Sequence, residues 1–215
     1  MKTSTLLHSL FIGTAATALL SSCGEDPGEN VNQATTTDAV EKGDSSVPEG
    51  AVRYEFLDSS KITFVGSKKV GASHEGGFNE FSGFFTLKDG KPVGNDHQVV
   101  IQMDSLFSDA EKLTAHLKGD DFFAVSEFPT SKFDVTSLSP DGDSGYQISG
   151  NLTLRGTTKN ITFPAQVSLN DGLAELNAEF KINRMDFGVS YQGAGDNLIN
   201  EDVVIRFDLE AKAAE

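Results

Sequence analysis

Histidines next to acidic residues are the residues in this sequence whose types and spacing could support acid–base chemistry. His74 precedes Glu75, and His116 lies four residues before Asp120. An imidazole beside a carboxylate can transfer protons near neutral pH. The sequence contains no G-x-S-x-G, H-E-x-x-H or P-loop pattern that would supply a nucleophile, a metal site or a phosphate site. We therefore interpret both pairs as structural or solvated and predict that the chain is not an enzyme; a hydrolase-type activity is the less favoured alternative.

The single cysteine, Cys23, is the residue with the clearest covalent chemistry. It follows a positive start at Lys2, an apolar stretch from Leu6 to Leu20 and two serines. This order is typical of a secretory signal peptide, and the stretch is shorter than the ~20 residues that span a bilayer. The segment Leu20-Ser21-Ser22-Cys23 resembles the bacterial lipobox, in which the cysteine becomes the first mature residue and is acylated, with palmitate among the chains. A free thiol or an intermolecular disulfide would not explain this position.

The cysteine therefore predicts where the protein resides. Residues 1–22 are expected to be a lipoprotein signal peptide, and Cys23 is expected to be the lipidation site. The anchor is then covalent lipid in a bacterial cell envelope, since two acyl chains suffice for stable attachment. Gly24 follows the cysteine, where an aspartate would be the usual inner-membrane retention signal in enteric bacteria. The outer membrane, with the protein facing the periplasm, is thus favoured.

Residues 23–50 are predicted to comprise the lipidated cysteine and a disordered acidic tether. Positions 24–50 contain seven acidic residues, one lysine and almost no apolar residue larger than valine. Such a segment cannot bury enough apolar surface to become ordered. As a flexible coil it would span roughly 25–30 Å, which would let the rest of the chain move away from the membrane surface.

Charge and composition restrict the partners and the fold. The net charge is −15, and it becomes −16 when Lys2 is removed with residues 1–22. This acidic balance argues against a nucleic-acid partner, because phosphate contacts need a basic face. One cysteine allows no intramolecular disulfide, so residues 51–215 must fold by burial, which a domain of ~150 residues can do.

Apolar residues from Ala51 onward recur with a period of two. Val203, Ile205 and Phe207 alternate with Arg206 and Asp208, as in antiparallel strands with one buried face. The same alternation occurs in 52–56, 99–103, 133–135, 161–165 and 176–182, and turn signals separate the strands at 88–92, 139–145, 155–160 and 170–172. About eight strands in one domain suggest a closed or nearly closed barrel, which leaves no exposed edges.

One segment instead has helical spacing. Ser108 and Glu111 match a capping box, Leu113, His116 and Leu117 share one helical face, and Gly119 stands where a C-terminal cap belongs. A single short helix is therefore predicted at about 109–118. Lys118, Asp120 and Asp121 are expected to cap and terminate it.

The interior of such a barrel is either filled by side chains or able to hold one small ligand. The sequence has sixteen phenylalanines and no tryptophan, and its buried faces carry few groups that would bond a polar ligand. An elongated apolar guest would suit this interior. Periodicity alone leaves both alternatives open, because the phenylalanines are equally consistent with a packed core.

Four motifs resemble the YceI-like family of periplasmic polyisoprenoid-binding proteins, and the resemblance covers roughly residues 51–212. They are HLKGDDFF at 116–123, GNLTLRGTTKNI at 150–161, INRMDFGV at 182–189 and EDVVIRFDLEA at 201–211. The resemblance implies an extended antiparallel, lipocalin-like barrel with one short inserted helix. It also implies an apolar tunnel that holds an isoprenoid chain, such as a polyprenyl phosphate or a quinone. Many members have a histidine after the second strand, where this sequence has Gly66-Ser67-Lys68-Lys69 and reaches a histidine only at His74.

The site residues follow from these motifs. Seven phenylalanines are candidates for lining or closing the cavity, with core packing as the alternative: Phe81, Phe85, Phe122, Phe123, Phe128, Phe133 and Phe187. Arg155 and Arg184 are candidates for a ligand head group, because guanidinium suits phosphate. An ion pair with an acid such as Asp186 is their alternative role, and Asn183 is expected to bond backbone at the bend after a strand.

The sequence as a whole predicts a lipid-anchored envelope protein that binds an isoprenoid or a similar amphiphile in an apolar barrel tunnel. The binding would serve sequestration or transport and would need no cofactor and no metal, only a bound polyisoprenoid or quinone-like lipid. The alternative is a non-catalytic envelope protein with a filled barrel whose outer face binds another protein.

Overall fold

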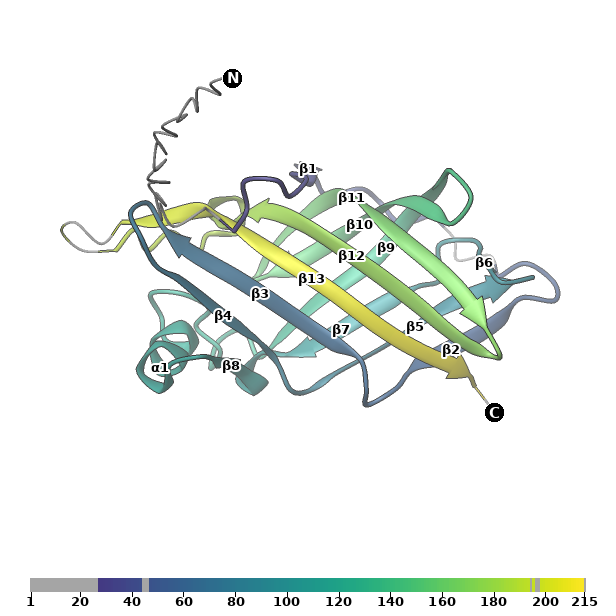
Figure 1. Cartoon of the computed structure of the whole chain (residues 1–215), viewed down its shortest axis with the longest axis horizontal. Coiled ribbons are helices and arrows are strands. Elements are labelled where there is room, and N and C mark those ends of the chain that lie inside the picture. The colour runs from purple at the N-terminus through teal and green to yellow at the C-terminus, as the bar shows by residue number, and fades with distance from the viewer. Residues whose placement is uncertain (1–26, 44–46, 194, 196–197, 215) are drawn as a thin grey trace, which may run out of the picture.

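The domain is an elongated barrel built from one antiparallel sheet (Figure 1). The computed structural model describes residues 27–43, 47–193, 195 and 198–214. Its strands are β1 (Thr35–Asp38), β2 (Val52–Phe56), β3 (Lys61–Lys68), β4 (Ser73–Phe78), β5 (Phe81–Lys88), β6 (Lys91–Pro92), β7 (Gln98–Gln102), β8 (Leu106–Ser108), β9 (Thr130–Asp141), β10 (Gly145–Leu154), β11 (Thr157–Asn170), β12 (Leu173–Asn183) and β13 (Ile199–Ala213). One α-helix, α1 (Glu111–Lys118), and two 3₁₀ turns, η1 (Met103–Ser105) and η2 (Arg184–Phe187), interrupt them.

The barrel closes through pairing between strands that are far apart in the sequence. The order β11-β10-β9-β7-β5-β2-β13 is closed by β12, which pairs with both β11 and β13. The N-terminal part of β13 pairs with β3 and its last residues pair with β2, so β2 and β3 occupy one position in the wall. The result is a closed barrel of eight antiparallel strands with one helix. The predicted all-β, lipocalin-like fold is therefore confirmed.

The predicted turn segments lie where strands end. Three hairpins have positive φ at both central positions, namely 89–90, 155–156 and 171–172, which matches the two-residue type I′ turn that suits twisted strands. The fourth segment lies between β9 and β10. At 155–160 the turn is shorter than expected, because β11 already begins at Thr157.

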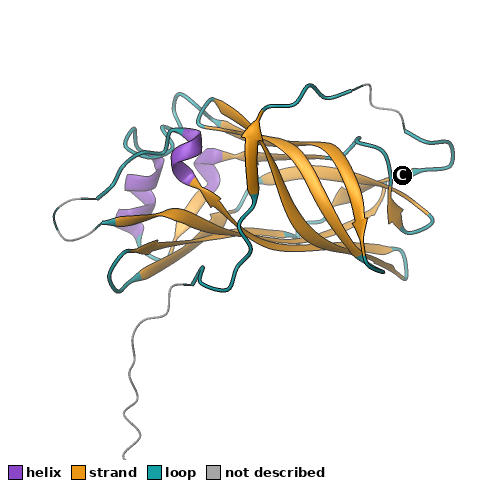
Figure 2. Cartoon of the chain, turned by 90° about the horizontal axis from the view of Figure 1, so that it is seen from above, coloured by secondary structure: helices purple, strands orange, loops and turns teal. Residues whose placement is uncertain are grey.

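The helix and both 3₁₀ turns gather at one end of the barrel, which we call the helix end (Figure 2). Helix α1 begins after Ala110, so the predicted capping box is wrong. Ser108 belongs to β8 and pairs with Gly76 of β4, which holds it away from the first helical turn. Its hydroxyl lies 2.9 Å from that of Thr114. Gly119 does occupy the C-cap and donates its N–H to the carbonyl of His116.

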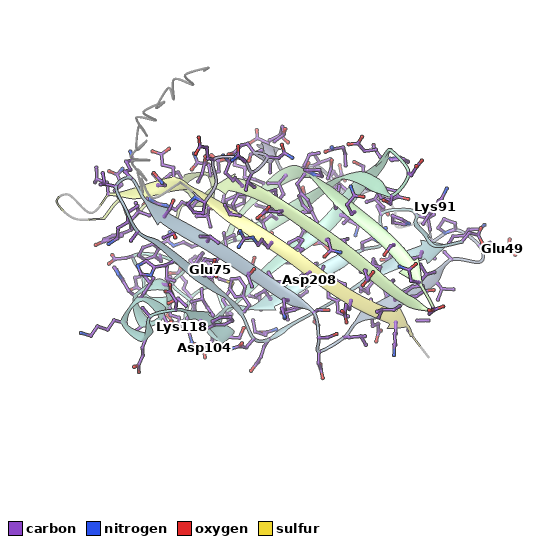
Figure 3. The ribbon with its side chains drawn as sticks, in the orientation of Figure 1. Glu49, Glu75, Lys91, Asp104, Lys118 and Asp208 are labelled. Carbon is purple, nitrogen blue, oxygen red and sulfur yellow. The ribbon has the colours of Figure 1, made fainter. Side chains whose placement is uncertain are left out.

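The residues expected to terminate α1 have other partners. The Lys118 ammonium lies 3.3 Å from an Asp104 carboxylate oxygen and therefore joins α1 to η1 (Figure 3). The carbonyl of Asp120 accepts a hydrogen bond from Arg155, and Asp121 pairs with His116. The C-cap is Gly119, so the prediction of capping roles for these three residues is wrong. Lys118 and Asp121 instead make side-chain ion pairs, and Asp120 makes its contact through its backbone carbonyl.

A segment that the sequence predicts to be a disordered tether forms part of the barrel wall. Strand β1 pairs with residues 159–162 of β11, and just before it Ala34 donates its N–H to the carbonyl of Lys181 in β12 at 2.8 Å. Strands β11 and β12 pair only from Gln166 to Asn170, opposite Leu173 to Asn177. The segment 32–38 therefore fills the interval where they separate, and we call it the strap. The disordered-tether prediction is wrong here, because backbone pairing along a free edge needs no large apolar side chains.

Two apolar clusters stabilise the barrel. The larger includes Phe163, Phe180 and Leu209 and also Phe187 of η2. The smaller includes Phe64, Leu117 and Phe122 and packs α1 against the helix end. Among the described residues, no helix has the length and apolar composition needed to cross a bilayer.

Candidate functional site

A cavity of about 460 Å³ occupies the half of the barrel next to α1. This volume lies within the ~300–1,000 Å³ typical of small-molecule sites. Its wall is almost entirely apolar and includes Ile62, Phe64, Ile182, Ile205 and Phe207. Helix α1 and the segment after it contribute Leu113, Leu117 and Phe123. The barrel is therefore hollow at this end, and the filled-barrel alternative does not describe this half.

Strand alternation explains why these side chains face inward. Along β13, Val203, Ile205 and Phe207 line the cavity. Arg206 points the other way, and its Nε donates a hydrogen bond of 2.7 Å to Glu179 on β12. A strand places successive side chains on opposite faces, so the apolar–polar pattern of the sequence is converted into a dry interior and a charged exterior.

Four phenylalanine rings close the inner end of the cavity. The rings of Phe163 and Phe180 are stacked, with centroids 4.0 Å apart and an interplanar angle of 11°. Phe207 meets both rings edge-on, at 5.9 Å and 5.6 Å, and Phe133 packs against Phe163 at 5.5 Å. Beyond these rings lies a separate cavity of only about 40 Å³. We call these four residues the ring cluster.

Arg184 is the most unusual polar residue at the opposite end of the cavity. It begins η2, lines the cavity and is only 5% exposed. Its Nε donates to the carbonyl of Asn200 at 3.0 Å, and its Nη1 donates to the carbonyl of Val189. The third nitrogen, Nη2, is buried without a hydrogen-bond partner. Burial lowers the pKa of Arg184 from its usual value, and the charge of Glu201 opposes this effect.

Two histidines also line the cavity at the helix end, and both have acidic partners other than those expected. His116 lies 3.0 Å from Asp121, and its ring meets those of Phe122 and Tyr191 edge-on. His74 lies 2.9 Å from Asp109. Their neighbours in the sequence, Glu75 and Asp120, are therefore not their partners. Neighbouring side chains on a strand point to opposite faces, which separates His74 from Glu75.

The second candidate arginine lies outside the cavity. Arg155 occupies a hairpin turn with φ of 49°, and its guanidinium donates to the carbonyls of Gly188 and Asp120 at 3.0 Å each. It connects η2 to the segment after α1, so its predicted contact with a head group is not supported. Within the described part of the chain, neither arginine forms the alternative ion pair. Asn183 does bond backbone, because its side chain accepts the N–H of Met185.

The seven candidate phenylalanines divide into three groups. Phe122, Phe123 and Phe133 line the main cavity. Phe85 lines only the small cavity. Phe81, Phe128 and Phe187 line neither, so a lining role is wrong for them: Phe81 and Phe187 belong to the packed core, and Phe128 lies against the turn at Gly156.

Sequence reasoning missed Phe64, Phe78, Phe180, Phe207 and Tyr191, all of which line the cavity. The alternation in β12 and β13 identifies Phe180 and Phe207 as inward-facing residues. It does not indicate which stretch of the interior remains open. The candidate lipidation site Cys23 and the signal peptide 1–22 lie outside the described residues.

The site is arranged to hold an elongated apolar molecule with a polar end. The described residues include no group of three or more His, Cys, Asp or Glu side chains that could hold a metal ion. What the cavity offers is apolar surface, closed at one end by the ring cluster, and the buried side chain of Arg184.

Comparison with known proteins places this geometry in a family. The model of the YceI-like domain matches residues 57–211. A UPF0312 protein of Pseudomonas putida is 31% identical over 160 residues, covering 71% of this chain and 80% of that protein. A UPF0312 protein of Yersinia pestis is 36% identical over 110 residues, which is half of this chain and 57% of the relative's length. The chain thus spans little more than half of these Yersinia relatives.

Solved structures share the fold. BcnA of Burkholderia cenocepacia matches with a TM-score of 0.63 and 24% identity, over 71% of this chain and 96% of that one. A polyisoprenoid-binding domain from Saccharophagus degradans matches with a TM-score of 0.61 and 18% identity, over 76% of this chain and 99% of that domain. With the domain match over most of the barrel, these findings show that the chain belongs to the YceI-like family.

Proposed function

We propose that this protein binds an isoprenoid or a similar single-chain amphiphile in the cavity at the helix end, without transforming it chemically. The observation that carries the proposal is an apolar cavity of about 460 Å³ with a buried, unpartnered Arg184 Nη2 at one end. The chain of the ligand lies along the barrel toward the ring cluster, and its polar head lies near Arg184.

Burial of the chain provides enough free energy for tight binding. Each buried methylene contributes about 0.8 kcal/mol, so about fifteen carbons contribute roughly 12 kcal/mol before costs. Lost translational freedom and ligand ordering reduce this by about 4 kcal/mol or more. A dissociation constant in the micromolar range or below is expected. The shape of the wall favours one unbranched or methyl-branched chain, since the interior is enclosed by strands on all sides.

Arg184 recognises the head group. A buried N–H without a partner costs about 1–3 kcal/mol, and a ligand oxygen at Nη2 removes that cost. Phosphate and carbonyl oxygens both accept such a bond, and phosphate gains more because the interaction is charge-assisted. The guanidinium stays charged despite its lowered pKa, because arginine is not deprotonated in proteins.

The family and the fold relatives support this reading. One structural relative is described as a polyisoprenoid-binding domain, and the barrel of this chain has the apolar cavity that such binding requires.

We further propose that Cys23 is acylated and holds the protein in a bacterial envelope, at the outer membrane facing the periplasm. The support is the sequence around Cys23. The strap adds a geometric reason, because Asn32 accepts the N–H of Lys181 two residues before Asn183, where β12 reaches η2 and Arg184. The anchored end of the chain thus meets the barrel near the helix end, where a ligand from a bilayer would enter.

The test is native mass spectrometry of the full chain isolated from its own membranes. A co-purifying apolar molecule is expected on the wild-type protein. It should be lost in Val203→Trp, which fills the cavity, and retained in Val52→Trp, which changes an exposed valine on β2. A folded wild-type protein that carries no such molecule, and binds no prenyl alcohol added in detergent, would overturn the proposal.

A further inference from the structure

The ring cluster of Phe133, Phe163, Phe180 and Phe207 has a consequence for ligand choice. We infer that it is a floor that limits the length of the bound chain to about three or four isoprene units, and that Phe207 is the residue that sets this limit. The inference rests on the proposed function, because it names which isoprenoids the same cavity accepts.

The floor is a packed structure rather than a single protruding side chain. Phe163 and Phe180 are each only 1% exposed and lie face to face. Phe207 and Phe133 line both the main cavity and the small one, as does Val99, so these three side chains lie between the two. Stacked and edge-on aromatic pairs add to the energy of burial, and close-packed interiors resist the entry of further atoms.

The depth of the cavity gives one measure of the limit. On β13 the lining runs from Ile199 at the helix end to Phe207 at the floor. Eight residue steps of ~3.3 Å along a strand tilted by ~40° give a depth of roughly 20 Å. An isoprene unit contains four chain bonds of ~1.5 Å and advances roughly 5 Å. About four units therefore fit between the mouth and the floor.

A chain of eight or more units would be about twice as long as this depth. A longer chain would leave its remaining carbons in water, where they gain no burial energy.

The space beyond the floor explains why Phe207 controls the limit. The small cavity of about 40 Å³ is bounded by Phe163, Phe207 and Leu209, among others. It is too small for an isoprene unit, but removal of the Phe207 ring would join it to the main cavity. The extended space would reach as far as Leu209, two residues further along β13, which corresponds to about one more unit.

The experiment measures affinity against chain length with full-length protein stripped of lipid. The probes are geraniol, farnesol, geranylgeraniol, geranylfarnesol and octaprenol, which contain two, three, four, five and eight units. For the wild type, affinity should rise on the order of tenfold or more with each unit up to geranylgeraniol and then stop rising. In Phe207→Ala the rise should continue to geranylfarnesol.

Two further variants keep the test valid even if Phe207→Ala does not fold. Ile205→Phe adds a ring one layer closer to the mouth, so the affinity should stop rising at farnesol, which has three units. Phe81→Ala removes a phenylalanine that packs against the core but lines neither cavity, and it should leave the limit unchanged.

Each result bears on a separate proposal. If the folded wild type binds no alcohol of any length, the proposed function fails. If its affinity continues to rise to octaprenol, lipid binding stands and the floor is overturned. The floor is also overturned if folded Phe207→Ala and folded Ile205→Phe both keep the wild-type limit.

Discussion

The Nε of Arg184 donates a 3.0 Å hydrogen bond to the carbonyl of Asn200, so the first residues of β13 hold the guanidinium in place at the cavity. The bond to Val189 fixes a second nitrogen. Because the guanidinium is planar, these two bonds also fix the direction of the third nitrogen, Nη2, so the side chain is already ordered before a ligand binds.

Replacing Arg184 by lysine should remove head-group selectivity. An ammonium cannot bond both carbonyls and also reach the ligand, so the preference for geranylgeranyl phosphate over geranylgeraniol should fall by about tenfold or more. The variant should also lose about 1–3 kcal/mol of unfolding free energy. Isothermal titration with both ligands measures the preference, and urea unfolding measures the stability.

Arg155→Lys is the matched control, because Arg155 makes similar carbonyl bonds outside the cavity. It should lose stability and keep the wild-type preference for phosphate. An unchanged phosphate preference in Arg184→Lys would show that Nη2 does not contact the head group.

Gly76→Ala should destabilise the helix end. A Cβ at Gly76 would lie 2.4 Å from the carbonyl oxygen of Phe107 and 2.4 Å from the ring of Phe64. Since a backbone atom cannot swing aside, overpacking of about 1–3 kcal/mol is expected. Gly66→Ala on the neighbouring strand is the control, because its Cβ would meet nothing within 4 Å. Equal unfolding free energies for the two variants would contradict this account.

His97 should make stability depend on pH. It is buried, its Nδ1 accepts the N–H of Thr86, and its Nε2 donates to the carbonyl of Val93. Loss of solvation lowers its pKa in the folded state, although the bond to Val93 opposes this. The unfolded chain therefore takes up the proton first, near pH 6.5, and the unfolding free energy falls as the pH drops below about 7.

Urea unfolding at pH 7.5, 6.5 and 5.5 measures this effect. His97→Gln should be less stable at pH 7.5 by about 1–3 kcal/mol and should have a shallower pH slope than the wild type. Parallel profiles for His97→Gln and the wild type would exclude a role for His97.

Breaking the strap should expose the interval between β11 and β12. Ala34 is 4% exposed and belongs to the core, so Ala34→Asp would bury a charge and release segment 32–38. Hydrogen exchange should then accelerate at the amides of 35–38 and 159–162, while β9 and β10 stay protected. Thr37→Asp, at an exposed position of the strap, should leave the exchange unchanged. Wild-type protection in Ala34→Asp would show that the strap does not depend on this contact.

The barrel could be predicted from the sequence because apolar and polar residues alternate along its strands. In β13 the alternation of Val203, Ile205 and Phe207 with polar residues predicts both the strand and the side of it that faces inward. The strap could not be predicted from the sequence, because Thr35–Asp38 contains no large apolar residue and is held by backbone pairing to β11. Strand propensity and the pattern of apolar residues therefore do not indicate a strand that is held only by backbone pairing along the free edge of another strand.

The site could be predicted only in part, for a related reason. Arg155 and Arg184 stand in similar motifs, yet one bridges two surface segments and the other lies buried at the cavity. The difference arises from which carbonyls lie nearby in space. Likewise, Phe133 and Phe187 are both buried phenylalanines, but only the first borders empty space.

A barrel closed by Phe163, Phe180 and Phe207 cannot pass cargo from one side to the other. In the proposed binding mode, a lipid chain enters tail first and leaves head first through the same opening. Its release rate is then set by the full loss of buried surface, unless an acceptor meets the head group while the tail is still inside. Under this proposal, delivery requires contact with an acceptor at the helix end, and without such contact the protein would act as a store.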